Sequence, residues 1–324
     1  MFEFKLSPEP TKTEISGGLY DVVIIGAGAA GLTTAIYTAR DGLKTLILER
    51  ESAGGLAATT EMIENYPGFP DGINGAELLD RFRRQAERFG AEIVEFDEVV
   101  KVNPLKAGEI EVRTEGGKVY TGKTVVVATG SRPKKLNVPG EKEFYGRGVS
   151  YCATCDGPFF KDKNVVIIGA GNSGLQEGLQ VLEYAKQVTF LGSRPYARAE
   201  HILQEHVKSH PKSALLFNQQ VTAIQGDKTV TGVVAVDRET KEEHVYPTDG
   251  VFIYVGYSPY SAFVADLVET TKWGHIITDE KMQTKVAGLY AIGDVRADNP
   301  AQLSISVGDG AKAALAIRDF ILEL

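Results

Sequence analysis

The chain carries the same glycine-rich turn twice, and this duplication restricts the possible fold more than any other feature of the sequence. The glycines are Gly26, Gly28 and Gly31 in the first turn and Gly169, Gly171 and Gly174 in the second. Each turn follows an apolar run, residues 22–25 and residues 165–168, of the kind found in parallel strands covered on both faces. A segment with helical character follows each turn. Two such units predict an α/β protein with two Rossmann-like domains.

The first turn has the features of a dinucleotide site. Its three glycines permit, in order, a tight turn, close approach of the backbone to a pyrophosphate, and close packing of helix on strand. The next apolar run ends at Glu49, about 20 residues after Gly28, where a carboxylate can accept hydrogen bonds from ribose hydroxyls. The predicted contacts are Gly26, Gly28, Ala29, Ala30, Gly31 and Glu49.

The second turn repeats the glycine spacing without the acid. The strand expected at residues 187–191 runs into Gly192-Ser193-Arg194, and an arginine at this place can accommodate a 2′-phosphate. The predicted contacts are Gly169, Gly171, Asn172, Ser173, Gly174, Arg194 and Arg198. The alternative is a vestigial domain that holds no nucleotide.

Both cysteines of the chain, Cys152 and Cys155, lie three positions apart between the two turns. Such a pair can close a small disulfide ring, and a lowered thiol pKa supplies the thiolate that disulfide exchange requires. The alternatives are a zinc half-site and two unrelated buried thiols. The candidate further ligands are His201, His206 and His210, whose spacings fit no common zinc pattern. A redox disulfide is therefore predicted, and no metal.

Composition limits the remaining classes of function. The chain has 324 residues, 43% of them hydrophobic, which suits two domains with a core each. A net charge of -8 gives no basic stripe for nucleic acid, and no apolar run is long enough to span a membrane. The first residues show no signal-peptide pattern, so a cytoplasmic location is expected. In that reducing compartment a close cysteine pair is more plausibly catalytic than structural.

Two further strand ends carry polar signals. The apolar run at residues 124–127 leads into Ala128-Thr129-Gly130, and the run that ends at residue 292 leads into Gly293-Asp294. An Asp at the carboxyl end of a strand can accept hydrogen bonds from a ribityl or ribose hydroxyl. Taken alone, a Gly-Asp pair after a strand is often an ordinary turn.

Together these motifs resemble the low-molecular-weight thioredoxin reductases from end to end. The resemblance is carried by the first glycine turn, Gly54-Gly55 with Thr59-Thr60, and residues 64–68, 128–130, 146–150, 152–157 and 291–294. It implies an FAD domain formed by residues 1–132 and 257–324. A domain of residues 133–256, inserted into the first, would carry the disulfide and bind a nicotinamide nucleotide such as NADPH.

The resemblance also implies site residues and an assembly. Besides the first turn, the implied FAD contacts are Gly55, Thr60, Asn65, Ala128, Thr129, Gly130, Gly293, Asp294, Gln302 and Leu303. A homodimer is implied, as is a rotation of the two domains about the chain crossings near residues 132–133 and 256–259, because one fixed arrangement cannot bring the disulfide to both flavin and protein substrate.

The chain departs from the family at two places. The family's His-Arg-Arg-x-x-x-Arg run, which clamps the 2′-phosphate of NADPH, reads here from Gly192 to Arg198 with two arginines and no histidine. Loss of one charged contact would cost on the order of 1.5 to 3 kcal/mol, which weakens the case for NADPH. The family's Arg-Gln-Ala becomes Ala301-Gln302-Leu303, which removes a cation near the flavin.

The function implied is an electron relay from a donor through FAD to the disulfide and on to thioredoxin or a similar dithiol protein. By resemblance Cys155 faces the flavin and Cys152 attacks the substrate. Asp156 is predicted to carry the proton, because no histidine lies near the motif and a partly buried carboxylate can protonate a thiol; the alternative is a turn former before Gly157. Ferredoxin or a second flavin is the alternative donor. Two different functions also stay open: a dithiol oxidase that passes electrons to oxygen, and a non-catalytic protein that is stabilised by zinc or senses a nucleotide.

Overall fold

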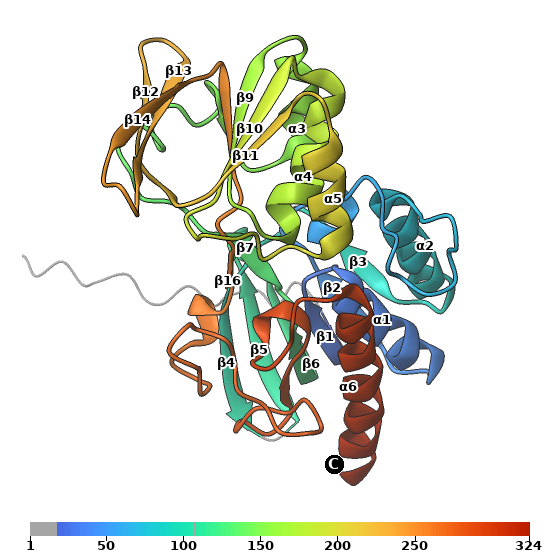
Figure 1. Cartoon of the computed structure of the whole chain (residues 1–324). Coiled ribbons are helices and arrows are strands. Elements are labelled where there is room, and N and C mark those ends of the chain that lie inside the picture. The colour runs from blue at the N-terminus through green and yellow to red at the C-terminus, as the bar shows by residue number, and fades with distance from the viewer. Residues whose placement is uncertain (1–17, 107) are drawn as a thin grey trace, which may run out of the picture. The chain divides into compact units, whose positions relative to one another are not determined.

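The structure, a computed structural model, describes residues 18–106 and 108–324 and divides into two compact units (Figure 1). Unit 1 comprises Met1–Ala57, Glu77–Gly130 and Pro259–Leu324, and unit 2 comprises Ala58–Ala76 and Ser131–Ser258. Residues 1–17, which include the stretch expected to lack a signal pattern, lie outside the described residues.

Unit 1 is built on a seven-stranded sheet in the order β3-β2-β1-β6-β5-β4, with β17 also paired to β6. The strands are β1 (Leu19–Ile25), β2 (Thr45–Leu48), β3 (Glu92–Val94), β4 (Val99–Lys106), β5 (Glu109–Thr114), β6 (Val119–Val127) and β17 (Leu289–Ala291). The pairs around β1 are parallel, whereas β4, β5 and β6 pair antiparallel. The apolar run of β1 lies at the centre, and Val22, Val23 and Ile24 are fully buried, as its sequence predicts.

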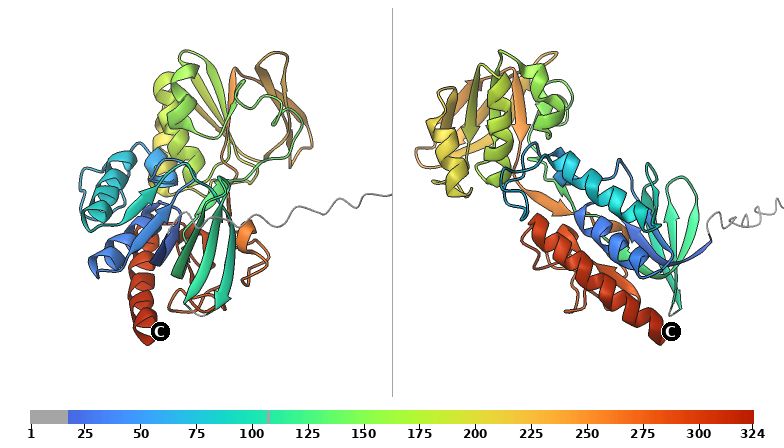
Figure 2. Two further views of the ribbon diagram at one scale, coloured as in Figure 1. Left: turned by 180° about the vertical axis from the view of Figure 1, so that it is seen from behind. Right: turned by 90° about the vertical axis from the view of Figure 1, so that its right-hand side faces the viewer.

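The helices of unit 1 are α1 (Ala29–Arg40), α2 (Gly75–Arg88), which begins at the boundary with unit 2, and α6 (Leu303–Glu323). Helices α1 and α6 lie side by side (Figure 2). Small residues allow this approach: a Cβ at Gly310 would lie 2.5 Å from the carbonyl oxygen of Ala30, and Thr34 Oγ1 donates a 3.1 Å hydrogen bond to Gly310 O. The carboxyl end of the chain thereby packs against the helix that follows the first glycine turn.

Unit 2 contains a parallel five-stranded sheet in the order β11-β10-β9-β15-β8. Its strands are β8 (Val149–Ser150), β9 (Asn164–Ile168), β10 (Gln187–Leu191), β11 (Ser213–Leu216) and β15 (Gly250–Ile253). Helices α4 (Asn172–Tyr184) and α5 (His201–Ser209) pack together, and the short helix α3 (Ala153–Asp156) lies against α4. The predicted α/β fold with parallel sheets is confirmed.

A separate antiparallel sheet of β12 (Gln219–Gly226), β13 (Val230–Asp237) and β14 (Glu243–Pro247) completes unit 2 (Figure 1). The two chain crossings form a small sheet of their own, in which β7 (Ser131–Pro133) pairs with β16 (Tyr257–Pro259). The rotation of the two domains about these crossings stays a prediction. In the part of the chain that the structure describes, no helix combines the length and apolar content needed to cross a membrane.

The division into units differs from the predicted domains at Ala58–Ala76, which the sequence assigns to the FAD domain and the structure groups with unit 2. Hydrogen bonds explain the grouping. Thr154 Oγ1 donates to Thr59 O at 2.6 Å, and Gln176 Nε2 donates to Met62 O at 3.1 Å. The segment is therefore fastened to α3 and α4 by contacts that sequence spacing does not reveal.

Candidate functional site

The first glycine turn connects β1 to α1, and two of its glycines are required by the chain itself. Gly26 has a φ of 108°, and a Cβ there would lie 2.4 Å from Ala128 O. A Cβ at Gly31 would lie 2.0 Å from Gly26 O. A side chain at either place would collide with backbone, so these residues allow the strand, the turn and the helix to pack closely.

Gly28 is different, because a Cβ there would meet no atom within 4 Å. It is the N-cap of α1, with a φ of -78° that any residue can adopt. The second turn repeats this arrangement: a Cβ at Gly174 would lie 2.2 Å from Gly169 O, whereas Gly171 faces open space. Both helices thus begin at an open backbone cradle suited to a pyrophosphate.

Glu49 lies directly beside the first turn and is buried. Its Oε2 accepts a 2.7 Å hydrogen bond from Ala27 N, and its Oε1 accepts a 3.0 Å bond from Glu51 N. A carboxylate oxygen can accept more than one hydrogen bond, so both oxygens retain capacity for ribose hydroxyls. The binding of ribose hydroxyls by this acid stays a prediction.

Asp294 follows β17 at the same sheet. Its carboxylate accepts a 3.2 Å hydrogen bond from Ser306 Oγ, and burial raises its pKa. The adjacent Gly293 has a φ of 68°, a conformation that favours glycine. A partly buried acid at the carboxyl end of a strand paired with β6 can accept hydrogen bonds from a ribityl chain, and that role stays a prediction.

Sequence reasoning missed Asp309, a buried residue of α6 that fixes this turn. Asp309 Oδ2 accepts hydrogen bonds from Gly293 N at 3.2 Å, from Arg296 Nε at 3.1 Å and from Asn299 Nδ2 at 3.0 Å. In the sequence, Asp309 stands out only as an acid within a helical segment of small residues. Its role depends on hydrogen-bond partners that only the tertiary structure brings together.

The other predicted FAD contacts divide between the units. In unit 1, Thr129 Oγ1 donates to Tyr260 O at 2.6 Å, and a Cβ at Gly55 would lie 3.2 Å from the Cα of Gly28. The remaining predicted residues of this unit lie in the first turn, at the end of β6 and at the start of α6: Ala29, Ala30, Ala128, Gly130, Gln302 and Leu303. Thr60 and Asn65 lie in unit 2, so their place at the flavin stays a prediction.

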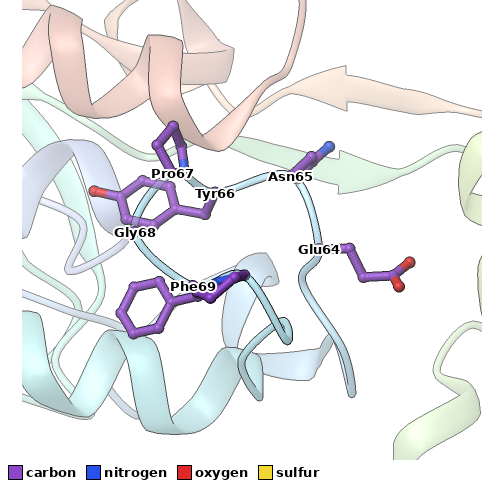
Figure 3. Close-up of a pocket in the computed structure, with 7 residues that line it drawn as sticks. Glu64, Asn65, Tyr66, Pro67, Gly68 and Phe69 are labelled. Carbon is purple, nitrogen blue, oxygen red and sulfur yellow. The ribbon is translucent and has the colours of Figure 1, made fainter.

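Asn65 belongs to a loop with a shallow pocket of about 370 Å³ that residues 64–70 line (Figure 3). The rings of Tyr66 and Phe69 stack with centroids 6.2 Å apart and an angle of 29°, whereas Glu64 points away from them. Burial raises the pKa of Tyr66. The loop therefore presents an aromatic face built from its own residues.

Cys152 and Cys155 form a disulfide across helix α3. Cys152 is the N-cap, and its Sγ accepts a 3.2 Å hydrogen bond from Cys155 N, while Ser150 Oγ accepts one from Cys152 N at 3.1 Å. Cys155 is exposed, and Asp156 N donates to Cys152 O. Sulfurs joined in this way lack the thiolates that zinc requires, so the structure supports a redox pair over a zinc half-site.

The neighbouring phenylalanines have opposite environments. Phe160 is buried and makes an edge contact with Phe252, with centroids 5.3 Å apart. Phe159 is 72% exposed. Of these two residues, Phe159 is therefore the one that can offer an apolar contact to a partner.

Charged side chains from other parts of the chain lie beside the second turn and the strand end that follows it. Asn172 and Glu200 exchange hydrogen bonds, Nδ2 to Oε1 at 3.1 Å and Glu200 N to Oδ1 at 2.8 Å. Arg194 and Arg198 are exposed near the end of β10. Arg238, which sequence reasoning missed, donates from Nη1 to Ser193 O at 3.0 Å. A third arginine thus reaches this strand end from a distant segment, although Glu200 opposes an anion there.

Comparisons with known proteins agree with this geometry. Residues 20–310 match the pyridine nucleotide-disulphide oxidoreductase family. The thioredoxin reductase of Bacillus subtilis (strain 168) is 43% identical over 307 residues, which cover 94% of this chain and 96% of that protein.

Solved structures give the same result. The thioredoxin reductase of Lactococcus lactis matches with a TM-score of 0.91 and 40% identity, over 94% of this chain and all of that chain. The T. acidophilum thioredoxin reductase matches with a TM-score of 0.90 and 43% identity, over 94% of this chain and 99% of the other. The chain therefore belongs to the pyridine nucleotide-disulphide oxidoreductase family, among the thioredoxin reductases.

Proposed function

We propose that the protein is an FAD-dependent thioredoxin-disulfide reductase that uses the Cys152–Cys155 disulfide as its redox centre. The observation that carries this proposal is the disulfide itself, closed across α3 in the unit that contains the second glycine turn. FAD, when bound, supplies a two-electron redox centre. The backbone cradle at Gly28, with Glu49 and Asp294 on the same sheet, would hold it.

The chain's own residues then perform disulfide exchange. Two electrons and two protons convert the Cys152–Cys155 disulfide to two thiols. Cys152, as a thiolate, attacks one sulfur of the partner's disulfide and forms a mixed disulfide, and the other sulfur of the partner leaves as a thiolate. Cys155 then attacks Cys152, which restores the internal disulfide and releases the partner as a dithiol. We assign proton transfer in these steps to Asp156, which directly follows Cys155.

The partner that fits is a small dithiol protein such as thioredoxin. Its disulfide must reach Cys152, the half-buried N-cap of α3, and the exposed ring of Phe159 lies just after that helix. An exposed aromatic ring beside a reactive sulfur provides an apolar contact that positions a macromolecular substrate. A homodimer in the cytoplasm remains the expected setting, in keeping with the resemblance and with a catalytic cysteine pair.

The electron donor depends on the second turn. The open cradle at Gly171 supports a nicotinamide nucleotide, and the absence of an arginine at Ser193 argues against tight binding of its 2′-phosphate. We therefore propose NADPH as a weakly bound donor. Ferredoxin or a second flavin is the second candidate, favoured by the altered clamp.

Anaerobic titration of the purified protein tests both the proposed reductase activity and the proposed electron donor. Loss of flavin absorbance on addition of stoichiometric NADPH, followed by reduction of thioredoxin, is the expected result. Loss of flavin absorbance with reduced ferredoxin and not with NADPH would identify ferredoxin as the electron donor. Rapid oxygen consumption with a small dithiol, without thioredoxin reduction, would identify a dithiol oxidase instead. Purified protein that binds no flavin would overturn the proposed function.

A further inference from the structure

The turn between β13 and β14, residues 238–242, lies against the strand end that follows the second glycine turn. Arg238 Nη1 donates a 3.0 Å hydrogen bond to Ser193 O. The backbone N–H of Arg238 donates to Asn218 O at 2.8 Å, and Asn218 N donates to Arg194 O at 3.0 Å. Arg238 is therefore fixed both at its backbone and at its guanidinium group.

A buried glutamine connects the same turn to the same strand end. Gln219 is 6% exposed, and its backbone N–H donates to Gly192 O at 2.9 Å. Its Nε2 donates to Asp237 Oδ2 at 2.8 Å. Asp237 Oδ1 accepts two backbone N–H groups within the turn, at 2.8 and 3.1 Å. The position of Arg238 at the strand end thus does not depend on its own contact alone.

Three exposed arginines lie near this strand end: Arg194, Arg198 and Arg238. Within residues 18–106 and 108–324, no carboxylate forms an ion pair with any of them. The neighbouring acids accept hydrogen bonds from amides instead, Glu200 from Asn172 Nδ2 at 3.1 Å and Glu239 from Asn218 Nδ2 at 3.2 Å. The guanidinium groups therefore keep N–H donors for an anion.

The place of these arginines in the fold selects the kind of anion. In a Rossmann unit, an arginine near the end of the strand after the glycine turn accommodates the 2′-phosphate of a dinucleotide. That strand is β10 here, and the open cradle at Gly171 suits the pyrophosphate. Arg198 N donates to Ala170 O at 2.9 Å, which connects the arginine run to the glycine turn. The planar guanidinium fork matches the oxygens of a phosphate.

We propose that Arg238 compensates in part for the missing arginine at Ser193 and binds the 2′-phosphate of NADPH. Arg194 and Arg198 supply the other guanidinium groups. Because both ends of Arg238 are already fixed, binding costs little further loss of side-chain freedom. The proposal rests on the proposed function only in taking NADPH as the nucleotide of the second turn. It assigns nucleotide specificity to a residue 45 positions along the chain from Ser193.

A purely structural role for Arg238 gives a different expectation. A tether that only holds the turn to Ser193 would affect the whole nucleotide site, so its loss would weaken the binding of NADP⁺ and NAD⁺ alike. A contact with the 2′-phosphate affects NADP⁺ only, because NAD⁺ lacks this group. The ratio of the two dissociation constants therefore separates the two roles.

The test is calorimetric titration of NADP⁺ and of NAD⁺ into the full-length protein with its flavin oxidised. The wild type should bind NADP⁺ more tightly than NAD⁺. Arg238→Ala should raise the Kd for NADP⁺ about tenfold, because one charge-assisted contact is lost. The Kd of this variant for NAD⁺ should equal that of the wild type.

Further variants control for net charge and for folding. Lys228→Ala removes a positive charge from the turn at the other end of β13 and should leave both dissociation constants unchanged. Ser193→Arg, added to Arg238→Ala, should restore the Kd for NADP⁺ to about the wild-type value, because it returns a guanidinium to the strand end. If Arg238→Ala does not fold, Arg238→Gln removes the charge and keeps an amide donor, and the same comparison applies.

Equal increases in both dissociation constants would make Arg238 a tether, and an unchanged Kd for NADP⁺ would remove it from the site. Either result overturns the proposal, as does a wild type that binds neither nucleotide or binds both equally. The reductase function fails separately. Flavin reduced by dithionite can pass electrons through the Cys152–Cys155 disulfide to thioredoxin without any nucleotide, so that transfer is measured independently.

Discussion

Tyr151 donates a 2.6 Å hydrogen bond to the buried carboxylate of Glu141, and this contact fixes the residue directly before Cys152. Glu141 also accepts bonds from the backbone N–H groups of Leu136 and Asn137 at 2.8 and 2.6 Å. A carboxylate with three donors in a buried site organises both the loop that enters unit 2 and the approach to the cysteine helix.

Replacing Glu141 by Ala should lower the free energy of unfolding by about 3 kcal/mol, because three donors in partly buried hydrogen bonds lose their acceptor. Tyr151→Phe removes one bond and should cost about 1 kcal/mol. Urea unfolding followed by circular dichroism measures both changes. Tyr145→Phe is the matched control, since Tyr145 is 65% exposed. A cost below about 1 kcal/mol for Glu141→Ala would show that the loop is held by other contacts.

The two kinds of glycine in the first turn can be separated by mutation. In Gly28→Ala the new Cβ meets open space, so the protein without FAD should keep its stability while flavin affinity falls about tenfold or more. In Gly31→Ala the new Cβ meets the Gly26 carbonyl oxygen, so folding itself should be impaired. Flavin absorbance of the purified protein and thermal unfolding of the flavin-free form measure these effects. Normal flavin content in Gly28→Ala would contradict a pyrophosphate at this cradle.

The raised pKa of Glu177, which burial causes, predicts how the free energy of unfolding depends on pH. Its pKa is about 7 in the folded protein and 4.5 as an ordinary glutamate, so the folded state retains a proton that the unfolded state loses between these values. The stability contributed by the protonated group is complete below about pH 4.5 and declines as pH rises to about 7, by at most about 3 kcal/mol.

Urea unfolding of Glu177→Gln and Glu183→Gln across this interval provides the measurement. The free energy of unfolding of the wild type and of Glu183→Gln, which removes an exposed acid on the same helix, should fall between about pH 4.5 and 7. That of Glu177→Gln should change less over the same interval, because the variant has no carboxyl group to ionise at this position. Parallel profiles for all three proteins would mean that Glu177 is ionised throughout the interval.

The exposure of Phe159 predicts that its removal affects the reduction of protein substrates but not of small-molecule substrates. Phe159→Ala removes an exposed apolar surface beside the cysteine helix, so KM for thioredoxin should rise about tenfold. Reduction of a small aromatic disulfide, which needs no docking surface, should keep its kcat. Phe96→Ala is the control, because Phe96 is 73% exposed in unit 1. Equal effects on both substrates would place Phe159 in the chemistry of the disulfide rather than in docking.

The sequence predicts those parts of the structure that depend on local backbone requirements. The glycine turns, the strands before them and the close cysteine pair follow from residue spacing, because only glycine tolerates the backbone contacts at Gly26 and Gly31. The role of Asp309 could not be predicted, since its partners come from another part of the chain. For the same reason the grouping of Ala58–Ala76 with unit 2 and the environment of Glu177 were missed: both depend on tertiary packing.

Ser193 offers a test of the electron donor. Its side chain is exposed at the end of β10, and its carbonyl oxygen accepts a hydrogen bond from Arg238 Nη1. Ser193→Arg would add a guanidinium beside Arg194 at the place where NADPH-dependent relatives are expected to carry one, which should lower the Kd for NADPH about tenfold. The Kd for NADH should stay unchanged, because NADH has no 2′-phosphate, and Ser193→Ala should alter neither. If Ser193→Arg lowers the Kd for NADPH and for NADH equally, the gain comes from general charge attraction, and the end of β10 does not bind the 2′-phosphate specifically.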